Sequence, residues 1–168
     1  MNLTTKEIDQ ILFYSKNGII VRRSVWSDVE YLKTRLRLSD QIEIMASHSH
    51  SSFQALSLAF QESIFCLTIV DNDIPVGMFG INAKSLLSDQ AVVWMLASRR
   101  LNRIKIRFLK NCKFFINIML QYYPVLYNHV HVENLKALVW LKFLGASIHE
   151  SKPHGPYGEK FCYFEFRR

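Results

Sequence analysis

The chain has 168 residues, a formal net charge of +7, and a hydrophobic fraction of 49%. This length and composition predict one globular domain with a buried core and exclude global disorder. The longest apolar stretch, residues 114–127, is interrupted by Asn117, Gln121 and Pro124, so it is too short and too polar to cross a bilayer. Residues 1–17 lack a signal-peptide layout, so we expect a cytoplasmic protein.

The cysteine spacing and the charge limit the kinds of partner. Cys66, Cys112 and Cys162 are far apart and form no C-x-x-C motif, which indicates a reduced protein without a cysteine zinc site. The positive charge favours an anionic partner, namely nucleic acid, a phosphorylated cofactor or an acidic protein. Ordinary solubility explains the same charge.

Two pairs of histidines have a spacing that could begin a metal site. His129 and His131 share one strand face, as do His48 and His50 if that segment is extended. Zinc needs more ligands than a pair supplies, so we expect no metal site.

The first half of the chain predicts a lead-in helix, a strand, three helices and a hairpin. S/T/D-x-x-E patterns are typical helix starts, and Asx residues are typical of tight turns. The predicted elements are a helix over Lys6–Tyr14 within residues 1–18, a strand Ile19–Arg23, helices that start at Ser27, Asp40 (to about Ala46) and Ser52, and strands Ile64–Val70 and Val76–Asn82 around the turn Asp71-Asn72-Asp73.

The second half predicts strands that alternate with helices. The long helix has an apolar stripe at Ile104, Phe108, Cys112, Phe115, Met119 and Tyr122. The predicted elements are strand Ala91–Ala97, helix Asn102–Tyr123, strand Val125–Val132, helix Leu135–Leu144 with Asn134 as its cap, and strands Ser147–Ser151 and Lys160–Phe166 around the loop Lys152–Glu159.

Several short motifs occur in a fixed order along this pattern. They are P-V-x-M-F-G at residues 75–80, W-x-L at residues 94–96, N-x-x-A-x-x-W-L-x-x-L-G at residues 134–145, and K-P-x-G-x-x-G-E-x-F at residues 152–161. Together they resemble the GNAT superfamily of acyl-CoA-dependent N-acetyltransferases. The resemblance is closer still to a group of tailed-phage GNAT-like proteins, described as acetyltransferase-like or internal virion proteins.

The resemblance implies one GNAT-like domain over residues 1–168, with residues 1–18 as a lead-in helix. The expected fold is α/β, with a mixed, mostly antiparallel central sheet flanked by helices. Ala91–Ala97 and Val125–Val132 should be neighbouring parallel strands joined by the long helix.

The resemblance also implies where acetyl-CoA would bind as a co-substrate. The phosphate loop of the superfamily, Q/R-x-x-G-x-G/A, is replaced here by residues 98–103, which contain no glycine. Arg99, Arg100 and Arg103 would hold the phosphates through their side chains, or they form a solvated basic surface. Other predicted contacts to the co-substrate are the strand residues Met95, Leu96 and Ala97, whose amides would stabilise the oxyanion, and Asn134.

The predicted catalytic residues are Glu43 and Asn128. Glu43 would be the general base, or it is an ordinary helix residue paired with Arg37. Asn128 would polarise a carbonyl or orient the substrate, or it is a buried amide satisfied by the backbone. Many enzymes of the superfamily have a tyrosine as general acid where this chain has Leu141, so any proton donor would be water or a tyrosine such as Tyr127 or Tyr157.

Two functions remain open from the sequence. One is acetyl-CoA-dependent N-acetylation of an amine on a protein substrate. The other is a GNAT fold that serves virion assembly or binds a host protein, in the host cytoplasm or the virion. The basic segment Arg99–Lys113 makes nucleic-acid binding a secondary possibility. The helix Leu135–Leu144, with Trp140 and Phe143, is apolar almost all round, so it is either fully covered or docks a partner, and we expect ordinary core.

Overall fold

The computed structural model describes residues 14–16, 18–83, 85 and 87–168. Within them, one sheet has the strand order β1-β2-β3-β4-β5-β6-β8-β7. The strands are β1 (Tyr14–Lys16), β2 (Ile19–Arg23), β3 (Phe65–Asp71), β4 (Ile74–Asn82), β5 (Gln90–Ala97), β6 (Val125–His131), β7 (Ser147–His154) and β8 (Glu159–Arg167). The helices are α2 (Trp26–Leu32), α3 (Leu38–His48), α4 (Ser52–Glu62), α5 (Leu101–Tyr122) and α6 (Leu135–Leu144).

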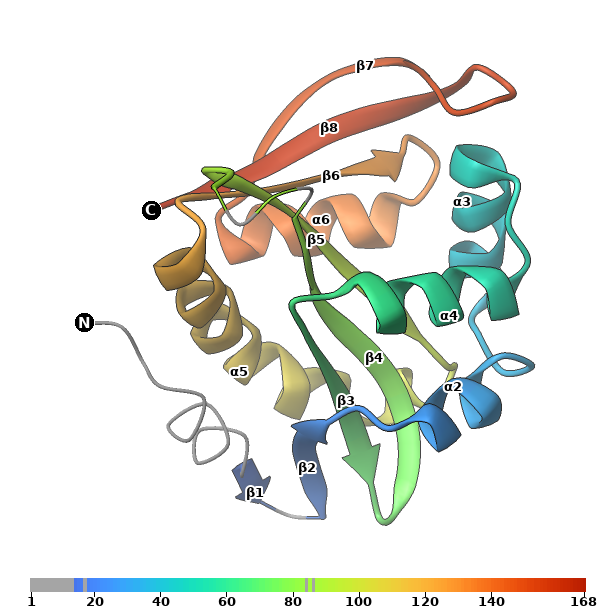
Figure 1. Cartoon of the computed structure of the whole chain (residues 1–168), viewed down its shortest axis with the longest axis vertical. Coiled ribbons are helices and arrows are strands. Elements are labelled where there is room, and N and C mark those ends of the chain that lie inside the picture. Colours follow the sequence, from blue (N-terminus) through green and yellow to red (C-terminus); the bar gives the residue numbers. More distant parts are fainter. Residues whose placement is uncertain (1–13, 17, 84, 86) are drawn as a thin grey trace.

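Helices cover the sheet in two groups, and each group has its own apolar cluster. One cluster joins the sheet to α5 and α6, and the other joins it to α2, α3 and α4 (Figure 1). Because successive side chains of a strand point to opposite faces, Phe79 of β4 belongs to the first cluster and Met78 to the second. The α/β class and the mostly antiparallel sheet are therefore confirmed.

The crossover at the centre of the sheet has the predicted form. β5 and β6 are parallel neighbours, and α5 connects them. All other pairs of neighbouring strands in the described sheet are antiparallel. The buried stripe of α5 is confirmed over Ile104–Met119, which packs against the sheet. Within the described residues, no helix is both long and apolar enough to span a membrane.

Two predicted element boundaries are wrong. The lead-in helix falls largely on residues 1–13, which lie outside the described part, but its end, Tyr14–Lys16, is a strand. It pairs with β2 across Gly18, whose φ of +77° suits a reversal. At the other end of the chain, β7 continues to His154, and Gly155 and Gly158 with positive φ close the hairpin.

The helix starts predicted at Ser27 and Asp40 are also wrong. α2 starts at Trp26, and the Asp28 carboxylate accepts a hydrogen bond from the Val25 amide at 2.9 Å. α3 starts at Leu38, ahead of the predicted Asp40. The third helix does have a capping box, formed by Ser51 and Gln54.

Asp28 joins α2 to the sheet. Its two carboxylate oxygens each lie 2.8 Å from a guanidinium nitrogen of Arg22, and the Thr68 hydroxyl donates to it at 2.7 Å. Burial opposes ionisation of Asp28, but these partners outweigh it and lower its pKa below the ordinary value. The ionised carboxylate therefore stabilises the fold.

Replacing Asp28 by alanine should lower the free energy of unfolding by roughly 3 kcal/mol, because the Arg22 guanidinium loses its partner. Since the folded pKa of Asp28 is lowered, its contribution is present above the ordinary pKa of about 4 and is lost as the pH falls through the lowered value. Urea unfolding at pH 7 and pH 3 measures this loss.

Asp28→Asn should show a smaller drop in stability between pH 7 and pH 3 than the wild type. Glu150→Gln at an exposed site is the control and should behave as the wild type. An equal drop in Asp28→Asn and wild type would contradict the assignment.

Candidate functional site

A gap opens in the sheet where β5 and β6 separate. Their paired residues run only from Gln90↔Val125 to Val92↔Tyr127. Just beyond, the Asn128 amide donates to the Val93 carbonyl at 2.8 Å, and its oxygen accepts from the His129 amide at 2.8 Å. Asn128 is thus satisfied by backbone groups, and it marks the closed end of the gap.

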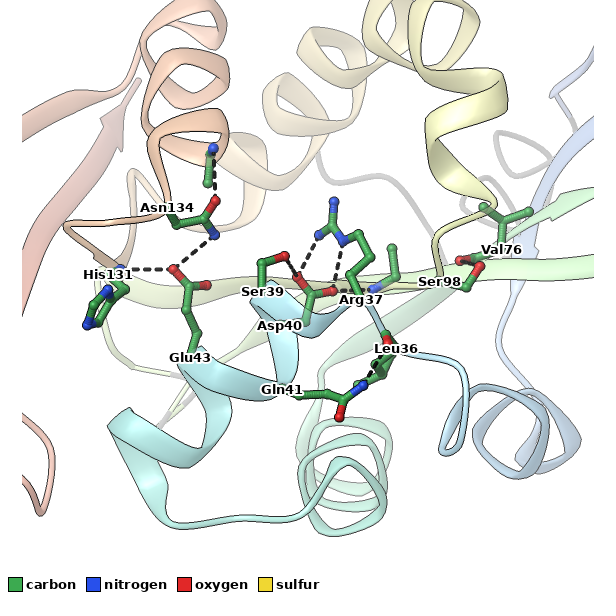
Figure 2. A network of polar contacts seen from close by, with 12 residues as sticks. Leu36, Arg37, Ser39, Asp40, Gln41, Glu43, Val76, Ser98, His131 and Asn134 are labelled. Carbon is green, nitrogen blue, oxygen red and sulfur yellow. Dashed lines mark hydrogen bonds and ion pairs between the residues drawn. The ribbon is translucent and has the colours of Figure 1, made fainter.

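The far end of the gap is occupied by the segment that leads into α3. The Asp40 carboxylate accepts from the Ala97 amide at 2.8 Å, and the Arg37 amide donates to the Ala97 carbonyl at 2.9 Å (Figure 2). Ser98 instead donates its backbone N–H to the Val76 carbonyl of β4 at 2.8 Å. Both backbone groups of Ala97 are therefore used within the protein.

These contacts identify the backbone groups that face the gap. In an antiparallel strand, the N–H and C=O of alternate residues point to opposite neighbours. Because the Val93 carbonyl and both Ala97 groups point away from β4, the N–H and C=O of Met95 point into the gap, whereas those of Leu96 point toward β4. Of the predicted residues Met95, Leu96 and Ala97, only Met95 offers backbone groups to a ligand there.

Asp40 is 3% exposed and is held by Arg37. The guanidinium donates to its two oxygens at 2.8 and 3.1 Å. Burial raises the pKa of Asp40 above the ordinary value, although the Arg37 charge and hydrogen bonds act in the opposite direction. The alternative pairing of Arg37 with Glu43 is wrong, since Asp40 takes this guanidinium.

Glu43 lies one turn after Asp40 on the same side of α3. Its Oε1 accepts from the His131 amide at 2.9 Å and from the Asn134 side chain at 3.1 Å (Figure 2). Asn134 in turn accepts from the Ala137 amide at 3.3 Å, which confirms its role as the cap of α6. Burial raises the pKa of Glu43, and the neighbouring Asp40 adds to this shift.

One cavity of about 440 Å³ connects these groups. On the side of α3 it is lined by Asp40 and Glu43, in the gap by Met95 and Asn128, and near the end of β5 by Arg99. Between the sheet, α5 and α6 the lining is apolar. The residues of that part include Phe108, Cys112, Phe115, Met119, Leu141, Leu144, Phe164 and Phe166.

The three predicted phosphate ligands lie in different surroundings. Arg99 is exposed and lines the cavity. Arg100 forms an ion pair with the buried Asp71 at 3.0 Å, and Arg103 is exposed but does not line the cavity. Lys105 and Lys136 line it, although sequence reasoning missed them because they lie outside the loop that the family motif covers.

The start of α5 offers few free backbone donors. The amides of Leu101, Asn102 and Arg103 donate to the carbonyls three residues earlier, at 3.0–3.1 Å. These bonds form a tight turn in place of a glycine loop with outward-facing amides. Any phosphate at this position would therefore depend on side chains.

Helix α6 places two neighbouring side chains in the cavity wall. Leu141 is buried there, at the position where the resemblance implies a tyrosine. Trp140 also lines the cavity, and its buried Nε1 has no hydrogen-bond partner among the described residues. Tyr127 stacks on Tyr163 and does not line the cavity.

Histidines gather beside Glu43 on the α3 side of the sheet. The rings of His129 and His154 stack with centroids 3.9 Å apart, and those of His48 and His50 with centroids 5.6 Å apart. Burial and the neighbouring histidines lower the pKa of His48 and His129. The described residues contain no group of three or more side chains able to hold a metal ion.

One family model matches part of the chain by sequence. A sequence profile of the family described as "Bacteriophage T7, probable scaffold protein Gp13" matches residues 84–152. No curated protein matches the chain by sequence.

Several solved structures with a similar fold are acetyltransferases. RimL, a ribosomal-protein alpha-N-acetyltransferase in complex with coenzyme A, has a TM-score of 0.69 at 9% identity over 92% of this chain and 97% of that chain. A GCN5-related N-acetyltransferase from Kribbella flavida has a TM-score of 0.66 at 17% identity over 92% and 100%. Spermidine N-acetyltransferase from Vibrio cholerae, in complex with CoA and spermine, has a TM-score of 0.58 at 15% identity over 90% and 96%. The chain thus has the GNAT fold that its motifs predicted.

Two substitutions at Glu43 separate its hydrogen bonds from its charge. Glu43→Ala should lower the free energy of unfolding by about 1–3 kcal/mol, because the His131 amide and the Asn134 side chain lose their acceptor. Glu43→Gln keeps an oxygen acceptor. Since the folded pKa of Glu43 is raised, its stabilising contribution is present below the ordinary pKa and is lost as the pH rises through the raised value.

At pH 7 the Gln variant should therefore be at least as stable as the wild type, and at pH 4 the two should be equal. Thermal unfolding at both pH values measures this. Equal destabilisation by Gln and Ala at pH 7 would show that the charge itself holds the two donors.

Proposed function

We propose that this protein is an acetyl-CoA-dependent N-acetyltransferase that acts on an amine of a protein substrate. The observation that carries the proposal is the one cavity that is lined both by Met95, whose amide faces the gap, and by Glu43. An acyl transfer needs a donor for the carbonyl oxygen and a base for the amine, and these groups supply both.

The residues of the cavity suit CoA, although not through a glycine loop. The indole N–H of Trp140 is buried without a partner among the described residues, and a carbonyl of a bound ligand would satisfy it. The apolar wall between α5 and α6 suits an extended arm, and Arg99, Lys105 and Lys136 provide positive charge for phosphates. Acetyl-CoA would supply the acetyl group as a thioester.

The transfer forms a bond between the amine nitrogen and the acetyl carbon, breaks the carbon–sulfur bond and releases one proton from the amine. Glu43 lines the cavity, and burial raises its pKa, so its carboxylate is a stronger base than an ordinary glutamate and would accept this proton. The Met95 N–H would donate to the carbonyl oxygen as negative charge develops there. Leu141 has no proton to give the leaving sulfur, so water must supply it and turnover should be slow.

A polypeptide acceptor is favoured by the outer side of α3. Leu38, Ile42 and Met45 are 59, 49 and 46% exposed, and they follow one another along the helix that carries Glu43. An exposed apolar row on the outer side of the helix that carries Glu43 suits contact with a protein surface better than a small polar amine.

The second candidate is a GNAT fold used for binding, in virion assembly or with a host protein. Three observations favour it. Leu141 cannot donate a proton, the first amides of α5 already have hydrogen-bond acceptors within the protein, and residues 84–152 match a phage scaffold family. Acetyl-CoA binding distinguishes the two functions, because a binding protein without chemistry has no need of it.

Acetyl-CoA at 100 times its dissociation constant should stabilise the wild type by about 2.7 kcal/mol, measured as a thermal shift. The combined change of Arg99, Lys105 and Lys136 to alanine should weaken binding at least tenfold and reduce its salt dependence. Arg103→Ala is the matched control, since this exposed arginine lies outside the cavity. Unchanged affinity in the triple variant would remove these residues from the phosphate site, and no binding by the wild type would move the protein to the second candidate.

Restoring the missing acid should raise the rate. Leu141→Tyr should increase single-turnover acetylation of a mixed peptide library by about tenfold or more, whereas Glu43→Gln should reduce it by about a hundredfold. Leu141→Phe controls for the added ring without the hydroxyl. Wild-type turnover that Glu43→Gln leaves unchanged would exclude Glu43 as the base.

A further inference from the structure

Helix α6 has an outer face that nothing in the described part of the chain covers. Leu135, Val139 and Phe143 are 67, 69 and 59% exposed. Their spacing of four residues places them in one row along the ten-residue helix. The opposite side of α6 is occupied, because Leu141 and Leu144 are buried and Trp140 lines the cavity. The expectation that this helix is ordinary core is therefore wrong for this row.

The charged residues of α6 itself have a single sign. Lys136 and Lys142 are the remaining exposed residues of α6, and the helix contains no acidic residue. Lys113 of α5 lies with its Nζ 4.9 Å from the centre of the Phe143 ring, so a third lysine borders the same row. The outer face of α6, defined by these three apolar residues and three lysines, is thus apolar along its middle and basic at its sides.

We propose that the outer face of α6 binds an acidic amphipathic helix of a partner protein. Apolar residues one turn apart match the side-chain rows of such a helix, and flanking Glu or Asp side chains would meet the lysines. A second copy of this chain fits poorly, because a symmetric contact would place the lysines against one another. Of the residues that define this face, only Lys136 also lines the cavity, and none is a proposed catalytic group, so the proposal does not depend on acetyl transfer.

A membrane surface is disfavoured by the size of the face. Helices that lie in a bilayer interface bury a broad apolar side, and many are 20–30 residues long. α6 has ten residues, with three large apolar side chains on the exposed row. A single row of this length suits one helix of a protein partner.

The test is selection from a displayed library of amphipathic helices in which the positions beside the apolar row are randomised between Glu and Lys. The full chain should enrich Glu at these positions, and synthetic copies of the enriched peptide should bind the wild type in fluorescence anisotropy. Val139→Gln with Phe143→Gln should weaken that binding at least tenfold. Leu58→Gln, at an exposed apolar residue of α4, is the matched control and should bind as the wild type.

A second variant, Lys113→Glu with Lys142→Glu, keeps the apolar row and should also weaken binding at least tenfold. Circular dichroism of each variant shows that it is folded. Enrichment of Lys, no enrichment, or peptide binding that survives both double variants would overturn the proposal. So would binding of the wild type to phosphatidylglycerol vesicles that the same variants abolish, or self-association through this face in sedimentation.

Discussion

The gap in the sheet depends on one buried carboxylate. Asp40 accepts the Ala97 amide, and the neighbouring Arg37 amide donates to the Ala97 carbonyl, so the start of α3 replaces a strand at the end of β5. Without these bonds, the last backbone groups of β5 would be buried and unpaired. The same bonds fix α3 in place, and Glu43, one turn later, is thereby held over the gap. One tertiary contact thus sets both the open backbone at Met95 and the position of the carboxylate beside it.

Much of this arrangement was predictable from local patterns in the sequence. The alternation of strands and helices gave the element order, and the spacing after Asn134 gave the cap and the fold family. Glu43 and Asn128, the two residues predicted to be catalytic, both line the cavity. Periodicity also predicted the buried stripe of α5, since a helix that covers a sheet must bury one side.

The wrong predictions for individual residues share one physical cause, because each of these residues contacts a partner that is distant in the sequence. Arg100 looked like a phosphate ligand, but Asp71, at the end of β3, forms an ion pair with its guanidinium. Ala97 looked available to a ligand, but its amide is held by a residue 57 positions away. Asp40 looked like a helix cap, because the local sequence pattern does not reveal that its carboxylate accepts the Ala97 amide. Local rules describe what a side chain can do, and tertiary packing decides which partner it has.

The backbone amides at the start of α5 already donate hydrogen bonds within their own turn, and this changes how a phosphorylated ligand would be held. Outward-facing amides are rigid donors, whereas Arg99, Lys105 and Lys136 must be ordered by the ligand and are screened by salt. The contacts to the phosphates would then contribute less of the binding free energy than they do with a loop of outward-facing amides. More must come from the apolar wall between α5 and α6 and from the buried donor of Trp140. Recognition in this cavity therefore falls mainly on the extended apolar part of a ligand and only secondarily on its charged end.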